Sequence, residues 1–258
     1  MSNLAEEAQG PLYFDVGRCP VCEHEVRFNA WGTNLRDTYL CGRCGSIPRE
    51  RALMAALNRF YPNWRELRIH ESSPGTRGVS PKLLTECPGY VSSQYHPTIK
   101  PGDTHPEEGW RCEDLEKQTF ADGIFDLVIT QDVLEHVFDF DNVCKEIART
   151  LAPGGAHVAT TPLVRQTKPT ILCAERLKDG SVKNHYPPEM HGNPVDGSGS
   201  LVTFWWGYDI AERIDSVAPF NTLLYLVEDK SQGIAGPLNE VLISMKRRKA
   251  EPKAKSAR

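Results

Sequence analysis

Four cysteines near the start of the chain constrain its fold more than any other feature. They form two C-x2-C pairs, Cys19 with Cys22 and Cys41 with Cys44, and 18 residues separate the pairs. Two such pairs at this spacing are typical of a tetrahedral zinc site with four thiolate ligands. The sequence therefore predicts a zinc ribbon within residues 1–60.

The segments around the cysteines fit this interpretation. Residues 26–28 and 38–40 can pair as a short hairpin between the two cysteine pairs. Ser46 can cap a helix that has Pro48 in its first turn and continues to about residue 60. Because cysteines fill all four positions, a zinc ion here would be structural and would lack an open position for a catalytic water. Unrelated surface thiols and a redox pair are the alternatives, and the presence of two pairs disfavours both.

Beyond residue 60, short apolar stretches alternate with segments of helical periodicity. Five strands are expected at residues 67–71, 90–95, 110–114, 125–130 and 156–161, with helices among them at 80–87 and 139–151. This alternation indicates β-α-β units and a doubly wound, Rossmann-like α/β sheet, whose ligands bind beyond the carboxyl ends of the strands. We expect this domain to span residues 61–246 and to close with a helix at 208–217 and strands at 221–227 and 240–246.

Two segments depart from this alternation. Residues 163–200 are rich in proline, glycine and polar residues and are too long for a simple connection. We expect them to form a lid or substrate loop. Residues 247–258 are largely basic and contain little that is apolar, so we expect a disordered tail.

Charge and hydropathy narrow the range of partners. The formal net charge is −4, but residues 246–258 hold seven basic residues and one acidic residue, so the rest of the chain carries −10. This acidic body disfavours a nucleic-acid partner. No stretch approaches the roughly 18 apolar residues that cross a bilayer, and the acidic start lacks the features of a signal peptide. We expect no membrane partner and a cytoplasmic location, and the sequence leaves the oligomeric state open.

The turn after the first expected strand of the sheet differs from a dinucleotide-binding loop. Such loops read G-x-G-x-x-G and precede an acidic ribose ligand by about 20 positions. Residues 71–78 instead read ESSPGTRG. Taken alone, Gly75 is explained equally well by a turn from strand to helix and by the close approach of a ligand. The identity of a nucleotide-like ligand therefore stays open at this point.

A more specific pattern lies further along the chain. Residues 125–137 read FDLVITQDVLEHV, and EIAR at 146–149 and LAPGG at 151–155 follow. These stretches resemble the fourth-strand and following-helix signature of class I S-adenosylmethionine-dependent methyltransferases, in particular the type 11 group. The resemblance extends over residues 67–161. It implies a methyltransferase with S-adenosylmethionine as its cofactor.

The resemblance also implies which residues hold the methionine end of the cofactor. Glu71 would bind the ammonium group, directly or through water. Gly75 would let the backbone approach the cofactor, although the usual glycine-rich loop of the family is replaced here. Gln131 would line the methionine side of the pocket.

For the nucleoside end, the resemblance points to three residues. Gln94 stands where the family has an acidic ribose ligand, and its amide would bind the ribose diol without the strength of a charged acceptor. Asp114 would accept the adenine amino group, and Leu115 would donate its backbone N–H. From the residues alone, Gln94 is equally explained as a solvated strand end, and Asp114 as the cap of a turn.

Methyl transfer displaces a sulfonium group, and it needs chiefly alignment, with a base where the acceptor is a hydroxyl. His136 follows the fourth strand at the expected mouth of the pocket, where packing against a helix is an equally good explanation. His185 and His191 belong to a polar, proline-rich part of the lid. We expect His136, His191 or His185 to accept the proton.

These observations predict a methyltransferase that carries a zinc ribbon and acts on an oxygen or nitrogen atom of a small molecule or glycan. An RNA methyltransferase is the second hypothesis, because some rRNA enzymes also place a cysteine zinc module before this fold. The third is a degenerate methyltransferase fold that serves as a binding or scaffold module, which the altered first loop and Gln94 suggest. Tight cofactor binding would argue against the third hypothesis, and steep salt dependence of RNA binding would favour the second.

Overall fold

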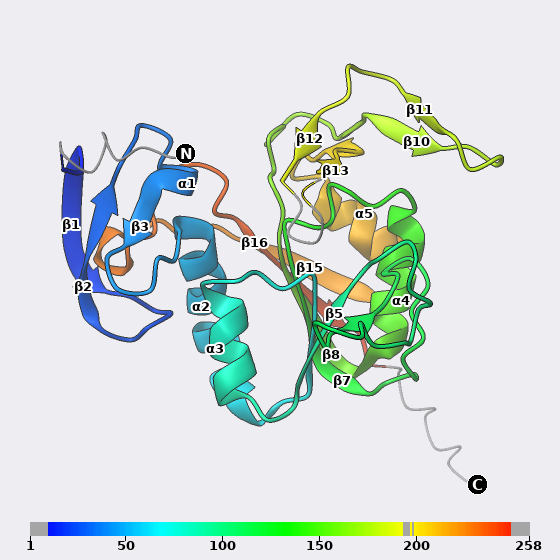
Figure 1. The fold of residues 1–258 in the computed structure, drawn as a ribbon, viewed down its shortest axis with the longest axis horizontal. Coiled ribbons are helices and arrows are strands. Elements are labelled where there is room, and N and C mark those ends of the chain that lie inside the picture. The colour runs from blue at the N-terminus through cyan, green and yellow to red at the C-terminus, as the bar shows by residue number, and fades with distance from the viewer. Residues whose placement is uncertain (1–9, 193–196, 198, 249–258) are drawn as a thin grey trace, which may run out of the picture.

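The computed structural model describes residues 10–192, 197 and 199–248. Most of the expected tail at 247–258 and residues 193–196 and 198 of the expected lid lie outside the described residues. A seven-stranded sheet forms the centre of the molecule, with helices on both faces and a smaller three-stranded sheet beside one of them (Figure 1). None of the described helices has the length and apolar character needed to cross a bilayer.

The central sheet has the strand order β15-β16-β8-β7-β4-β5-β6. Its strands are β4 (Ile69–Ser72), β5 (Tyr90–Gln94), β6 (Arg111–Cys112), β7 (Phe125–Gln131), β8 (Leu151–Thr160), β15 (Phe220–Tyr225) and β16 (Val241–Lys246). The strands from β4 to β8 are parallel, whereas β16 runs antiparallel to both of its neighbours. Strands β5 and β6 are added on one side of β4, and the chain then crosses back and adds β7 and β8 on the other side of β4. This reversal creates a crevice at the carboxyl ends of β4 and β7, where ligands bind in open α/β sheets.

Two helix layers cover the sheet. Helices α2 (Pro48–Phe60) and α3 (Val79–Glu86) pack on one face, and α4 (Phe140–Thr150) and α5 (Ile210–Val217) pack on the other (Figure 1). In β7, Leu127 and Ile129 face the first layer while Val128 faces the second, as the alternation of side chains along a strand requires. The predicted doubly wound α/β sheet is therefore confirmed.

Two expected strands depart most from their predicted limits. The strand expected at 110–114 is only Arg111–Cys112. Strand β8 begins at Leu151, although the strand was expected to begin only at residue 156. The pairing with β7 jumps from Phe125–Leu151 to Leu127–Ala156. The Pro-Gly-Gly segment between these pairs forms a bulge, and Gly154 adopts a φ of +84° there that favours glycine.

The N-terminal module contains a hairpin and one further strand, but the hairpin pairs residues 28–30 with 39–41 instead of the expected 26–28 with 38–40. Strands β1 (Tyr13–Arg18), β2 (Glu25–Ala30) and β3 (Tyr39–Cys41) form an antiparallel sheet, with the short helix α1 (Leu35–Thr38) before β3. The expected cap at Ser46 is wrong, because Ile47 occupies the N-cap position of α2. The Ile47 N–H donates to the Glu50 carboxylate at 3.0 Å, which replaces the hydroxyl cap. The Ser46 hydroxyl instead lies 3.2 Å from Cys44 Sγ.

The module and the sheet share one hydrophobic core. Phe28 and Tyr39 of the module belong to the same buried cluster as Ile69 and Val158 of the central sheet. The fully buried Arg51 of α2 donates to the Gly233 carbonyl at 2.9 and 2.6 Å. Gly233 directly follows the 3-10 helix η2 (Lys230–Gln232), which packs on β1. A boundary near residue 60, beside the short 3-10 helix η1 (Trp64–Glu66), stays a prediction, and the packing is continuous across it.

The expected lid is a set of short strand pairs. Its described residues, together with residues 201–205, form three antiparallel pairs, namely β9 (Ile171–Leu172) with β14 (Phe204–Trp205), β10 (Ala174–Arg176) with β11 (Val182–Asn184), and β12 (Met190–His191) with β13 (Ser200–Leu201). Thr203 anchors this region to the segment after β7, because its N–H donates to the Glu135 carbonyl at 2.7 Å and its hydroxyl to the Val137 carbonyl at 2.6 Å. The lid is thereby fixed beside the carboxyl end of β7.

Candidate active site

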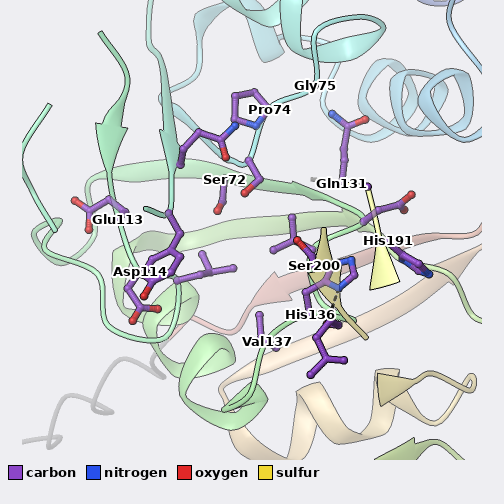
Figure 2. Close-up of a pocket in the computed structure, with 18 of the residues that line it drawn as sticks. Ser72, Pro74, Gly75, Glu113, Asp114, Gln131, His136, Val137, His191 and Ser200 are labelled. Carbon is purple, nitrogen blue, oxygen red and sulfur yellow. Dashed lines mark hydrogen bonds between the residues drawn. The ribbon is translucent and has the colours of Figure 1, made fainter. Parts of the chain in front are cut away.

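A cavity of about 830 Å³ opens beyond the carboxyl ends of β4, β5 and β7. Figure 2 shows Pro74 and Gly75 on one side of it, Asp114 at the left, His191 at the right and His136 below. The loop after β4, the ends of β5 and β7, the turn after β6, the lid and the N-terminal module all contribute to the lining. The pocket therefore lies at the crevice that the strand order predicts.

Five of the six residues expected to bind the cofactor line this cavity, and they are Gly75, Gln94, Asp114, Leu115 and Gln131. Asp114 lies at the turn after β6, where its carboxylate accepts the Glu116 N–H at 2.9 Å. Burial raises the pKa of Asp114 above its ordinary value. An added Cβ at Gly75 would come no closer than 3.7 Å to the Arg77 carbonyl oxygen, so the chain itself does not require glycine there.

Glu71, the sixth residue, has a different position from the expected one. Its side chain is fully buried and is not part of the cavity lining. It accepts hydrogen bonds from the hydroxyl of Tyr90 at 2.6 Å, the hydroxyl of Ser80 at 2.7 Å and the amide of Gln131 at 2.6 Å. Burial raises the pKa of Glu71, and these three donors oppose that shift. In this arrangement Glu71 orients Gln131, which does line the cavity.

The N-terminal module contributes two arginines that the sequence analysis missed. Arg36 of α1 and Arg49 of α2 line the cavity and pair with Asp132 at 2.7 and 2.8 Å. Asp132 adopts a φ of +51°, which is uncommon for a residue with a side chain and marks a constrained turn after β7. Among the described residues, the buried Arg36 Nε has no hydrogen-bond partner. Only the packing of the module on the sheet brings these arginines to the pocket, so spacing in the sequence gave no signal for them.

Two of the three expected histidines meet at the cavity. The rings of His136 and His191 lie 5.1 Å apart between centroids, with planes nearly perpendicular. His136 Nδ1 bonds to the Leu201 carbonyl at 2.9 Å, and burial lowers the pKa of His136. His185 is not part of the lining and lies 3.3 Å from Glu175. The lid hairpin of β10 and β11 holds His185 away from the other two rings.

Glu135 lies next to the two histidines and was also missed. It is buried, and its Oε1 lies 3.7 Å from His136 Nε2 and 4.0 Å from His191 Nδ1. Burial, and to a smaller extent the charge of Asp132, raise the pKa of Glu135 to about 8. The signal was present in the sequence, because Glu135 precedes His136 in the stretch that resembles methyltransferases.

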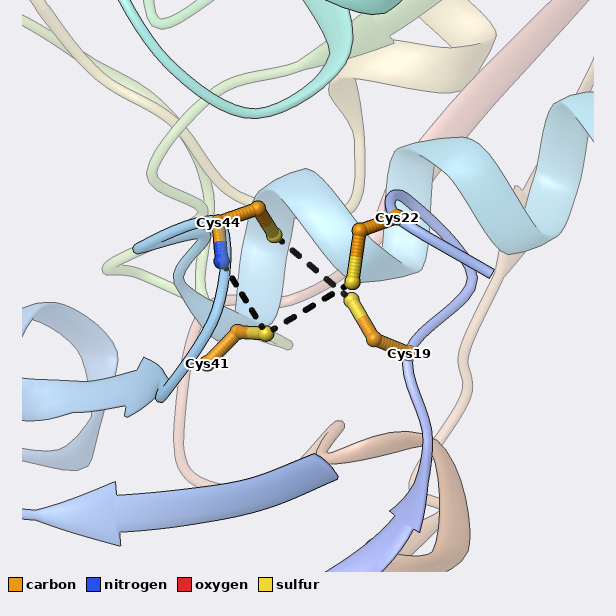
Figure 3. A group of neighbouring side chains, drawn as sticks. All are labelled: Cys19, Cys22, Cys41 and Cys44. Carbon is orange, nitrogen blue, oxygen red and sulfur yellow. Dashed lines mark hydrogen bonds between the residues drawn. The ribbon is translucent and has the colours of Figure 1, made fainter. Parts of the chain in front are cut away.

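The four cysteines form a compact cluster in the N-terminal module. Figure 3 shows their sulfur atoms converging from two loops. Cys19 and Cys44 have sulfurs 3.8 Å apart, those of Cys22 and Cys41 are 3.9 Å apart, and all four lie within 4.8 Å of one another. Zinc–sulfur bonds of about 2.3 Å in a tetrahedron place sulfurs roughly 3.8 Å apart. The donor set and its geometry fit a zinc ion.

One family model and several solved structures are similar to parts of this chain. Residues 97–159 match the type 11 family model, described as a methyltransferase domain. No curated protein sequence matches the chain. Among solved structures, the chain is similar to an S-adenosylmethionine-dependent methyltransferase from Mesorhizobium loti, with 17% identity, 76% of this chain and 98% of that chain covered, and a TM-score of 0.46.

Two further solved structures show a similar degree of likeness. An S-adenosylmethionine-dependent methyltransferase from Methanosarcina mazei matches at 14% identity over 74% of this chain and 98% of that chain, with a TM-score of 0.42. A phosphoethanolamine N-methyltransferase from Haemonchus contortus was solved with phosphomonomethylethanolamine and S-adenosylhomocysteine. It matches at 14% identity over 76% of this chain and 53% of that chain, with a TM-score of 0.44.

The family match falls on the part of the chain that builds the pocket. Residues 97–159 include β6, β7, α4 and most of β8, and with them Asp114, Gln131 and His136. The sheet around this region has its crevice at the carboxyl ends of β4 and β7, beside the cavity. The family match and the sheet together support a class I methyltransferase that depends on S-adenosylmethionine.

Proposed function

We propose that this methyltransferase acts on an oxygen or nitrogen atom of a small molecule or sugar. The main support is the cavity of about 830 Å³, because it has residues suited to the cofactor on one side and two histidines on the other. This volume lies within the roughly 300–1,000 Å³ typical of pockets for small ligands. The pocket is therefore large enough for a cofactor and a small acceptor together.

In this proposal, the nucleoside end of the cofactor lies at the turn after β6. Asp114 accepts the adenine amino group, the Leu115 N–H donates to the ring, and Gln94 bonds the ribose diol. All three residues line the cavity, which supports these roles. The acceptors and donors are of the types that an adenosine requires.

The methionine end then lies between Gly75 and the N-terminal module. Gln131 lines this side of the cavity. Its amide donates to the buried Glu71 carboxylate, which holds the Gln131 side chain in place. Arg36 is the candidate partner for the methionine carboxylate, because it is a cationic side chain that lines this part of the cavity. The module would thereby complete the cofactor site.

The acceptor would occupy the side of the cavity near His136 and His191. The cofactor supplies an electrophilic methyl group, whose bond to sulfur breaks as a bond to the acceptor oxygen or nitrogen forms. Burial lowers the pKa of His136, so its imidazole is neutral at pH 7 and can take the acceptor proton at Nε2. Its Nδ1 contact with the Leu201 carbonyl fixes the ring in this orientation.

We further propose that the four-cysteine cluster binds one structural zinc ion. The support is the separation of the sulfurs, 3.8 Å and 3.9 Å in two of the pairs, and the choice of four thiolate donors. Backbone N–H groups of Arg43 and Cys44 lie 3.5 Å from Cys41 Sγ, as expected for an anchored thiolate. The ion would hold the module in the position that brings Arg36 to the pocket.

Calorimetric titration with S-adenosylhomocysteine tests the cofactor site. We expect the wild-type chain to bind one equivalent and Asp114→Asn to bind about 10-fold to 100-fold more weakly, because an acceptor of a charge-assisted hydrogen bond contributes roughly 1–3 kcal/mol. Asp122→Asn is the matched control, since Asp122 is largely exposed and pairs with Arg149. Gly75→Ala should fold normally and also bind more weakly.

The outcomes separate the three hypotheses. Absence of binding to the wild-type chain would favour a binding or scaffold module over an enzyme. Transfer of labelled methyl groups should then be compared between polar small molecules, including sugars, and RNA oligonucleotides. Labelling of RNA alone, with a steep dependence on salt, would replace the small-molecule proposal with the RNA methyltransferase.

A further inference from the structure

Three side chains at the acceptor side of the cavity form a cluster that catalysis by a single base does not explain. Glu135 and His136 follow β7, and His191 ends β12 of the lid. One ligand atom of each lies within 4.8 Å of the others, and the set offers two imidazole nitrogens and one carboxylate oxygen. His136 and His191 are the labelled members of this cluster in Figure 2.

The Glu135 carboxylate has one oxygen without a hydrogen bond. Its Oε2 accepts the Thr161 hydroxyl at 2.8 Å. Its Oε1 is buried and has no hydrogen-bond partner among the described residues, and the two imidazole nitrogens at 3.7 and 4.0 Å are beyond hydrogen-bond length. Because Glu135 is only 2% exposed, an unpaired oxygen of this kind carries a large desolvation penalty. A cation between the carboxylate and the rings would remove that penalty.

In both histidines, the ring nitrogen that points away from the cluster makes a hydrogen bond that fixes the orientation of the ring, as in metal-binding histidines. The far nitrogen of His136, Nδ1, donates to the Leu201 carbonyl at 2.9 Å. The far nitrogen of His191, Nε2, donates to the Glu189 carboxylate at 3.2 Å, and Glu189 in turn accepts the Trp205 indole N–H at 2.8 Å. These bonds place the protons on the far nitrogens and leave a lone pair on each near nitrogen. Such outer contacts to a carbonyl or carboxylate are a regular feature of metal sites.

We propose that Glu135, His136 and His191 bind a divalent transition-metal ion at the acceptor side of the pocket. Two imidazoles and one carboxylate suit Mn²⁺, Fe²⁺ or Zn²⁺ and leave further coordination positions open. Bonds of about 2.1 Å bring neighbouring ligand atoms to roughly 3.0–3.4 Å, so the cluster has to close by about 1 Å. His191 belongs to a two-residue strand and its side chain is 36% exposed, which makes this movement available.

The open positions define the class of acceptor, an inference that rests on the proposed methyltransferase function. His136 and His191 line the cavity, whereas Glu135 is buried beside them, so the open positions of a bound ion would face the cavity and could take two oxygen atoms of one molecule. We infer an acceptor with adjacent oxygens, such as the diol of a sugar or a hydroxy acid. Binding to the ion promotes loss of the hydroxyl proton to solvent, the alkoxide forms the new bond to the methyl carbon, and the bond from carbon to sulfur breaks. In the metal-bound chain the two imidazoles act as ligands, and the ion replaces His136 as the group that promotes loss of the acceptor proton.

Binding of Mn²⁺ to the full chain tests the site without cofactor or acceptor. Mn²⁺ is the suitable probe because it prefers oxygen and nitrogen donors, whereas the four thiolates select zinc. Free Mn²⁺ is followed by electron paramagnetic resonance in protein that already holds its cysteine-bound zinc. We expect one Mn²⁺ per wild-type chain and at least about 100-fold weaker binding to Glu135→Gln and to His191→Ala. The matched control is His185→Ala, a lid histidine outside the cavity, which should bind within twofold of wild type.

If the site does not bind Mn²⁺, the same titration with Zn²⁺ tests whether it binds zinc instead. A wild-type chain that binds neither ion beyond the cysteine equivalent overturns the proposal, as do Glu135→Gln and His191→Ala variants that bind as tightly as wild type. Calorimetry with S-adenosylhomocysteine on the same samples separates this proposal from the methyltransferase function. Cofactor binding without metal binding refutes only the metal site, whereas metal binding without cofactor binding refutes only the proposed function. His191→Ala should keep its affinity for S-adenosylhomocysteine within about threefold.

Discussion

The cysteine cluster and the Glu135 cluster are built in opposite ways. The four cysteines come from two short loops of one small module, and their side chains fill every position of a tetrahedron. Glu135 and His136 follow a strand of the central sheet, whereas His191 comes from the distant lid. The first cluster is closed and suits a structural ion, while the second is open toward a cavity and suits an ion that meets a substrate.

The difference teaches how each cluster depends on the rest of the fold. A closed cluster contributes free energy to the module that supplies its ligands. An open cluster needs a scaffold that is already folded, because its ligands are far apart in the chain and one oxygen stays unpaired without the ion. Removing the first should therefore damage the structure, and removing the second should damage function alone.

Loss of one cysteine ligand should have the largest effect. Cys41→Ser should lower the zinc content by one equivalent and the melting temperature by more than about 10 °C, since structural zinc contributes several kcal/mol to folding. Because the module shares its core with the central sheet, the whole chain should lose stability. Elemental analysis and thermal unfolding measure both effects.

Cys173→Ala is the control for this experiment, because Cys173 is buried in the lid and lies outside the cluster. It should keep its zinc. A Cys41→Ser chain that melts at the wild-type temperature would show that the module does not depend on its metal, which would remove the contrast between the clusters.

A smaller loss of stability should follow from removing Arg51, which joins the module to the sheet without any metal. Arg51→Met leaves the carbonyls of Gly233, Tyr39 and Ser46 without this buried donor, and we expect a loss of about 3 kcal/mol. Urea unfolding measures the free energy, and the exposed Arg59→Met on the same helix is the matched control. Equal stability of the two variants would mean that zinc alone holds the module in place.

The smallest effect concerns the loss of stability at low pH. Acid should also release a metal ion from imidazole ligands, so that release must be distinguished from unfolding of the sheet. Burial lowers the pKa of His157 in β8 to about 4, so folding favours its neutral form. The stability from this residue is present above the ordinary pKa of 6.5 and is lost as the pH falls toward 4. Between pH 7 and pH 5, His157→Gln should reduce the acid-induced loss of stability by about 2 kcal/mol relative to wild type. Urea unfolding at the two pH values tests this, and an identical loss in both chains would contradict it.

Much of the architecture was predictable because its signals are local. The alternation of apolar strands and amphipathic helices predicted the doubly wound sheet, and the stretch at 125–137 predicted the methyltransferase fold. Errors occurred where pairing or capping depends on a neighbour. The Glu50 carboxylate replaced Ser46 at the start of α2, and pairing with β7 extended β8 back to Leu151.

The sequence by itself determined the cysteine cluster, because a C-x2-C pair brings two thiolates together within one turn of the chain. It also determined the strand that leads to His136. Only the tertiary structure decided that Glu71 is buried under Gln131, that Arg36 reaches the pocket, and that His191, but not His185, meets Glu135. The physical reason is that contacts between distant segments depend on how a module or lid packs on the sheet, and side-chain spacing along the chain carries no record of that packing.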